Sequence, residues 1–148
     1  MSRQHSDSSA RQLSLTKLEL ENFRCFAIGA IEFHPELTVL VAENAQGKSA
    51  VLAAASLALD PIVSELSGVR PHTLRADSVR VELEGEVHMQ PCLPMRLKAH
   101  GEVRGVSLGW ARSRASLSAY AGGSRRDLTA ATAEARELRR LALADSGC

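Results

Sequence analysis

Gly47, Lys48 and Ser49 are the consecutive residues whose types and order point most directly to chemistry. A phosphate-binding loop needs backbone N–H groups directed at the anion, at the N-terminus of a helix whose dipole favours negative charge. Glycine lets the backbone approach closely and adopt dihedral angles that a side chain would oppose. Lysine places a point charge on the β- and γ-phosphates, and a serine hydroxyl is a ligand for Mg²⁺. The trio therefore predicts binding of a nucleoside triphosphate.

The loop departs from the usual G-x4-G-K-[ST] pattern at its first position, where this sequence has Ala42. If that position needs a positive φ, alanine costs on the order of 1 kcal/mol, which is less than several hydrogen bonds to phosphate contribute. The alternative is a strand-to-helix turn that merely contains glycine. We predict that the loop holds Mg-ATP, with Ser49 also as the metal ligand. The predicted nucleotide-binding residues here are Asn44, Ala45, Gln46, Gly47, Lys48, Ser49 and Ala50.

The elements on either side of this loop have the required order. Residues 37–42 are nearly continuous apolar and β-branched, which predicts a central strand that is covered on both faces. Residues 49–59 are rich in Ala and Leu and predict an amphipathic helix that ends near Asp60-Pro61. Its expected apolar face is formed by Leu52, Ala55 and Leu59. A buried strand thus enters the loop and an apolar helix leaves it.

Alternating patterns predict the strands around this unit. Leu18 and Leu20 alternate with glutamates, and a short second strand follows at 30–33. Three further alternating runs, separated by glycines, predict an antiparallel meander, with Trp110 in the core. Their apolar positions are Val79, Val81 and Leu83, then Met95, Leu97 and Ala99, then Val106, Leu108 and Trp110. The segment 121–124 predicts a flexible joint, after which Asp127 caps a last helix. The apolar stripe of that helix is Leu128, Ala131, Ala135, Leu138 and Leu141.

Composition and charge narrow the class of protein. The chain has 148 residues with 45% hydrophobic and 24% charged residues, which predicts one globular domain. No run approaches the roughly 20 apolar residues of a membrane span, and the N-terminus has no apolar core of a secretory signal. Three cysteines without a CxxC spacing fit a cytoplasmic location better than a disulfide framework. Residues 96–140 hold ten Lys/Arg against four Asp/Glu; this excess predicts either contacts with nucleic acid or ion pairs within the fold.

The segment from Leu15 to Leu59 resembles the N-terminal part of ABC ATPases of the RecF/SMC type. That pattern is a strand ending in Asn-Phe-Arg, a short second strand, then a buried strand leading to G-x-N-G-x-G-K-S. Asn22, Phe23 and Arg24 match the first signature, and Asn44, Gly47, Lys48 and Ser49 match the second, whereas Ala42 and Ala45 replace glycines. Residues 70–145 are similar, more weakly, to bacterial AAA-type ATPases of the OLD-like and retron or anti-phage class. The resemblance implies that Arg24 lies near the nucleotide phosphates; the alternative is a surface arginine after a strand.

The resemblance also shows what the sequence lacks. Such ATPases need a strand ending in Asp-Glu (Walker B), a Ser-Gly-Gly signature and a switch histidine, and none is recognised here. The segment 141–145 has no following glutamate, and its Ala/Leu composition favours helix. We therefore assign no catalytic residue. We expect ATP hydrolysis only if a homodimer or a partner ATPase half supplies the missing motifs.

The prediction from sequence is an α/β fold: a P-loop NTPase, with an ABC-ATPase-like N-terminal lobe and a mixed or antiparallel sheet packed around the P-loop helix. We expect a disordered tail over 1–13 and a partial ATP-binding domain over 14–148. Within it we expect a P-loop lobe at 14–60, an antiparallel β region at 76–111 and a helix at 127–143.

The resemblance implies DNA repair or maintenance, or phage defence, as the process, with ATP, Mg²⁺ and DNA as partners and no membrane. The alternative function is a non-catalytic regulatory module that binds nucleic acid or protein through the basic second half. A small-molecule kinase is a third reading, for which no acceptor pocket or lid is recognised.

Overall fold

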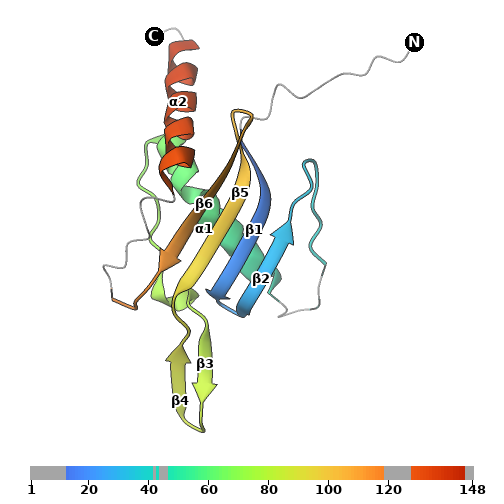
Figure 1. The fold of residues 1–148 in the computed structure, drawn as a ribbon, viewed down its shortest axis with the longest axis vertical. Coiled ribbons are helices and arrows are strands. Elements are labelled where there is room, and N and C mark those ends of the chain that lie inside the picture. Colours follow the sequence, from blue (N-terminus) through green and yellow to red (C-terminus); the bar gives the residue numbers. More distant parts are fainter. Residues whose placement is uncertain (1–12, 42, 44–46, 119–127, 146–148) are drawn as a thin grey trace, which may run out of the picture.

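The computed structural model describes residues 13–41, 43, 47–118 and 128–145 of the chain. It is a mixed α/β arrangement in which an antiparallel sheet packs against a long helix (Figure 1). In chain order the elements are β1 (Leu13–Phe23), β2 (Phe26–Glu32), α1 (Lys48–Ser67), the 3-10 helix η1 (Ala76–Ser78), β3 (Val81–Glu84), β4 (His88–Pro91), β5 (Met95–Val103), β6 (Val106–Arg114) and α2 (Thr129–Asp145).

The main sheet has the strand order β2-β1-β5-β6, with every neighbouring pair antiparallel. β1 therefore pairs with β5, although the two are far apart in the sequence. Alternate side chains of β1, β5 and β6 face α1, and the polar residues between them face solvent. The buried residues of these strands include Leu18, Leu20, Leu97, Ala99 and Trp110. The predicted alternation of Leu18 and Leu20 and the core position of Trp110 are confirmed.

The predicted three-strand meander is wrong in its first strand. β3 pairs with β4, a strand that the sequence analysis missed, and the two form a separate hairpin that projects from the body (Figure 1). All residues from Val81 to Gln90 are exposed. The strand-breaking Gly85 lies between β3 and β4, so it closes this short hairpin and does not connect β3 to β5. Only β5 and β6 keep the predicted neighbour relationship.

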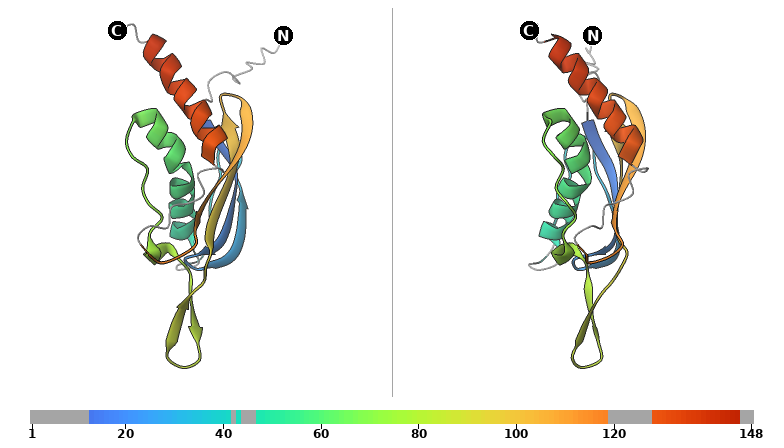
Figure 2. Two further views of the ribbon diagram at one scale, coloured as in Figure 1. Left: turned by 60° about the vertical axis from the view of Figure 1, so that its left-hand side comes forward. Right: turned by 90° about the vertical axis from the view of Figure 1, so that its left-hand side faces the viewer.

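The predicted helix after the loop exists, but its end and its buried face differ from the prediction. α1 continues through Pro61 to Ser67, where Gly68 terminates it in a left-handed conformation. Leu52 is exposed, and the face that packs on the sheet is formed by Ala50, Val51, Ala54, Ala58 and Ile62. Small alanines suit this face because the sheet already contributes large side chains, so the helix must approach closely. Both views in Figure 2 show α1 lying against one face of the sheet.

The predicted buried strand over 37–42 is wrong for its described residues. Residues 37–41 form no strand, and the exposed fractions of Leu37, Val39 and Val41 are 72%, 69% and 88%. A strand covered on both faces needs paired neighbours, and no described strand pairs with this segment. Ala42 lies outside the described residues.

The last helix agrees with its predicted stripe except at one end. Ala131, Ala135 and Leu138 of α2 are buried, whereas Leu141 is 41% exposed. The preference of residues 141–145 for helix is confirmed, and the joint at 121–124 and the Asp127 cap lie outside the described residues. α2 packs on the C-terminal half of α1 and on the end of β6 (Figure 2).

The sequence analysis found no segment long and apolar enough for a membrane span. α1 corrects this, because by length and composition alone it would suffice to cross a membrane. Its most apolar window has a mean hydropathy of 1.5. Its alanine face is packed on the sheet and belongs to the core.

Candidate functional site

Gly47 directly precedes α1, and an added Cβ atom there would displace one of two neighbouring side chains. Its φ is +89°, in the left-handed region that glycine adopts without steric cost. A Cβ atom at this position would lie 2.8 Å from Phe26 Cζ and 2.9 Å from Cys25 Sγ. The backbone conformation that was predicted to need glycine at position 47 is therefore confirmed. The contact of Gly47 with phosphate stays a prediction.

The first turn of α1 is electrostatically suited to an anion. The first helical backbone bond runs from the Val51 amide to the Gly47 carbonyl at 2.9 Å, so the amides before Val51 have no partner within the helix. Among the described residues no side chain caps this end, and the first turn contains no acidic residue. In a helix of 20 residues these amides carry the positive end of the helix dipole.

The structure brings Lys48 and Ser49 to this same turn. Lys48 is the first residue of α1, and its Nζ donates to the Glu43 carbonyl at 3.0 Å. The ammonium group is therefore near Glu43, which comes shortly before Gly47 in the chain. Ser49 is exposed and Ala50 is buried against the core. The remaining predicted residues, Asn44, Ala45 and Gln46, lie outside the described part of the chain.

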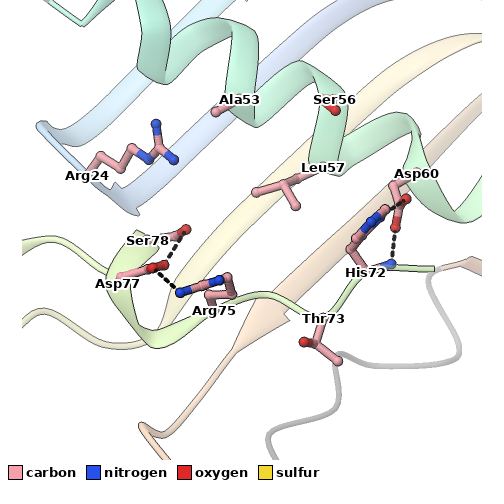
Figure 3. Close-up of a pocket in the computed structure, with 10 residues that line it drawn as sticks. All are labelled: Arg24, Ala53, Ser56, Leu57, Asp60, His72, Thr73, Arg75, Asp77 and Ser78. Atoms are coloured by element: carbon pink, nitrogen blue, oxygen red, sulfur yellow. Dashed lines mark hydrogen bonds and ion pairs between the residues drawn. The ribbon is translucent and has the colours of Figure 1, made fainter.

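Arg24 comes to this region from the β1–β2 turn. Cys25 and Phe26, the next two residues, are the ones that would clash with a side chain at Gly47, so the turn and the loop are in contact. The Arg24 guanidinium carbon lies 5.5 Å from the centre of the Phe23 ring, and the side chain reaches into a groove beside α1 (Figure 3). Arg24 thus lines the groove and directly precedes the two residues that approach Gly47. Its proximity to the phosphates stays a prediction.

The groove has a volume of about 500 Å³. One wall is the α1 face that carries Ala53, Ser56 and Leu57, and the other is the connector from His72 through η1 (Figure 3). Polar groups line much of it, including the Arg75–Asp77 ion pair at 2.9 Å. The groove therefore offers both hydrogen-bonding groups and the apolar surface of α1 to a bound molecule.

Asp60 ties the connector to α1, a role that the sequence analysis missed. Its carboxylate accepts from the His72 backbone amide at 2.6 Å and lies 2.8 Å from His72 Nδ1 (Figure 3). Arg112 reaches the same place from β6, where its Nη1 lies 3.5 Å from the Asp60 carboxylate. Nothing in the spacing of these three residues could have indicated this cluster, because they come from a helix, a connector and a strand.

Two arginines of β6 are buried under the connector. Arg112 donates to the carbonyls of Leu57 and His72, and Arg114 donates to that of Leu74. Burial lowers the pKa of the Arg112 guanidinium, and the nearby Asp60 carboxylate opposes that shift. Both side chains therefore fix the wall of the groove from inside the protein.

Most of the described basic residues in the second half form ion pairs or hydrogen bonds within the fold. Besides the two buried arginines, Arg96 pairs with Glu21 at 2.9 Å, Arg104 with Glu134 at 3.1 Å and Arg136 with Glu65 at 2.8 Å. Of the two interpretations of this excess, the described residues favour ion pairs within the fold. Arg125 and Arg126 lie outside the described residues.

Comparisons with known proteins agree with this architecture. A family model described as an AAA domain matches residues 17–134. A solved structure from work on ATP-driven dimerization and DNA-stimulated activation of SMC ATPases has a similar fold, with a TM-score of 0.53 and 20% sequence identity. The similarity covers 79% of this chain and 78% of that one. No curated protein matches the sequence.

Proposed function

We propose that this chain, which belongs to the AAA domain family and has the fold of SMC-like P-loop ATPases, binds Mg-ATP through residues 44–50. The observation that carries the proposal is the conformation of Gly47 at the start of α1. Its left-handed backbone starts a helix of 20 residues whose first turn contains no acidic residue, so the positive end of the helix dipole favours an anion at this position.

The residues of the first turn fit a triphosphate with its metal. Lys48 would exchange the Glu43 carbonyl for the β- and γ-phosphate oxygens, which as anions are the stronger acceptors. Ser49 would place its hydroxyl on Mg²⁺, which usually keeps phosphate oxygens and water as its other ligands. Arg24, on the adjacent turn, would add a second positive charge beside the phosphates. When bound, Mg²⁺ would neutralise part of the phosphate charge.

Hydrolysis needs a positioned water and a base besides the phosphate contacts. We propose that a homodimer or a partner ATPase half supplies them. Residues 37–41 support this, because their apolar side chains alternate along an exposed segment directly before the loop. An uncovered run of this kind is suited to pairing with a strand of another segment.

DNA repair or maintenance and phage defence are the processes that we propose on the resemblance alone, with a location in the cytoplasm. DNA-stimulated activation is a property of the SMC ATPases. For this chain, DNA contact predicts binding that weakens steeply with added salt. Salt-dependent DNA binding that is indifferent to ATP and to Lys48→Ala would instead favour the regulatory-module alternative.

The magnesium dependence of ATP binding tests the proposed site. We expect the unmodified chain to bind ATP more tightly with Mg²⁺ than with EDTA, and we expect Ser49→Ala to lose most of that difference. Ser113→Ala, on the opposite face of the sheet from α1, is the matched control and keeps it. A Ser49→Ala chain with an undiminished magnesium effect would contradict the assignment of Ser49.

A further inference from the structure

The turn between β1 and β2 has an unusual backbone on both sides of a buried residue. Asn22 and Arg24 have φ values of 51° and 50°, and Phe23 between them is fully buried. Asparagine tolerates the left-handed region, but arginine rarely occupies it. The strand register places Phe23 opposite Phe26, so Arg24 is the first of two turn residues, a position where such hairpins favour glycine.

Hydrogen bonds from two other segments hold this conformation. The Arg24 amide donates to the Ser78 carbonyl at 2.9 Å, and the Asn22 carbonyl accepts from the Arg80 amide at 2.8 Å. The Asn22 side chain adds a third connection, because its Nδ2 donates to the Pro94 carbonyl at 3.0 Å. Phe23 and Val79 form a bridge between these contacts. The turn is therefore attached to the segment after η1 and to the start of β5.

The consequence of this attachment is the direction of Arg24. Its side chain lines the groove (Figure 3), with the guanidinium carbon 5.5 Å from the centre of the Phe23 ring. The next two residues, Cys25 and Phe26, are the ones that approach Gly47. A strained backbone that the surrounding structure maintains is a frequent feature of functional sites. Here the strained residue is the one whose side chain lines the groove beside α1.

We propose that Asn22 is a positioning residue for nucleotide binding: it holds Arg24 in its left-handed conformation and directs the guanidinium to the terminal phosphate. This inference rests on the proposed function. It assigns to Asn22 a role in which two properties matter, namely tolerance of a positive φ and an amide that donates to Pro94.

The test is a double-mutant cycle on the affinity of the full chain for Mg-ATP and Mg-ADP. Arg24→Ala weakens ATP binding by about tenfold, because it removes a charged contact with the phosphates, and weakens ADP binding less. Asn22→Gly keeps the backbone freedom but removes the amide, and Asn22→Asp keeps the shape but cannot donate. Both reproduce most of the Arg24→Ala effect, and the Asn22→Gly/Arg24→Ala double variant binds no more weakly than Arg24→Ala.

The melting temperature of each variant is measured alongside the affinities. If the losses of Asn22→Gly and Arg24→Ala add independently, or if Asn22→Gly weakens ATP and ADP binding equally, the positioning role is overturned. If the unmodified chain binds ATP and Lys48→Ala abolishes binding while both Asn22 variants bind normally, only this inference fails. If the unmodified chain, shown to be folded, binds no ATP, the proposed function fails and this inference fails with it.

Discussion

Pro61 and Arg112 are complementary across the interface between α1 and the sheet. Pro61 lies inside α1 and has no N–H, so the carbonyl of Leu57, four residues earlier, loses its helical partner. Arg112 Nη1 donates to that carbonyl at 2.5 Å from β6. Trp110 lies two residues before Arg112 on the same face of β6, and its Nε1 donates to the Ala58 carbonyl at 2.8 Å. The sheet thus completes the hydrogen bonding of a helix that proline interrupts.

The first prediction follows from this relationship. Arg112→Met leaves the carbonyls of Leu57 and His72 without their donor, and we expect the free energy of unfolding to fall by about 3 kcal/mol. Pro61→Ala restores an N–H to α1. It should therefore stabilise the Arg112→Met chain by about 1 kcal/mol more than it stabilises the unmodified chain. Urea denaturation of the four chains measures this, and equal effects of Pro61→Ala in both backgrounds would refute the pairing.

The second prediction separates crowding at Gly47 from backbone strain. Gly47→Ala places a methyl group against Phe26 and Cys25, so we expect at least about tenfold weaker ATP binding. Gly105 is the control, because its φ of +75° is similar but no atom of the described residues lies within 4 Å of an added Cβ. Gly105→Ala should cost about 1 kcal/mol of stability and leave ATP binding unchanged. Titration of both variants with ATP decides the point, and normal binding by Gly47→Ala would contradict it.

Much of the local structure was predictable from the sequence because it depends on neighbours in the chain. The alternation around Leu18 predicted a strand, the stripe around Ala135 predicted α2, and the conformation of Gly47 followed from its place before a helix. Patterns of this kind report periodicity and turn chemistry, which are local properties.

What could not be predicted depends on residues far apart in the sequence. An Ala/Leu-rich helix has several faces apolar enough to be buried, and the large side chains of the sheet selected the alanine face over Leu52. The sequence analysis placed the end of the helix near Pro61. That α1 continues could not be predicted, because Arg112, the donor that compensates for the missing N–H of Pro61, lies on a distant strand. The cluster around Asp60 has no sequence signature for the same reason.

The third prediction concerns pH and the contact between α1 and α2. The hydrogen bonds from Arg136, followed by its positive charge, hold the pKa of Glu65 below its usual value of 4.5 in the folded protein. Because the folded pKa is depressed, the stabilisation is fully present above about pH 4.5 and is lost as the pH falls through the folded pKa.

We therefore expect Glu65→Gln to lower the free energy of unfolding by about 0.5 kcal/mol at neutral pH, since both partners are partly exposed and screened. The difference from the unmodified chain should shrink as the pH falls below about 4.5. Urea denaturation across this pH range measures it. A difference that stays constant with pH would show that Glu65 acts through packing and not through its charge.

The most direct test of the central claim is calorimetric titration of Mg-ATP into the unmodified chain, Lys48→Ala and Lys98→Ala. Lys98 is the control because it lies on the solvent face of β5, 3.6 Å from Glu19, and removes the same charge away from the loop. We predict that the unmodified chain and Lys98→Ala bind with similar affinity and that Lys48→Ala binds at least about tenfold more weakly. Equal binding by Lys48→Ala would contradict the assignment of residues 44–50 as the nucleotide site.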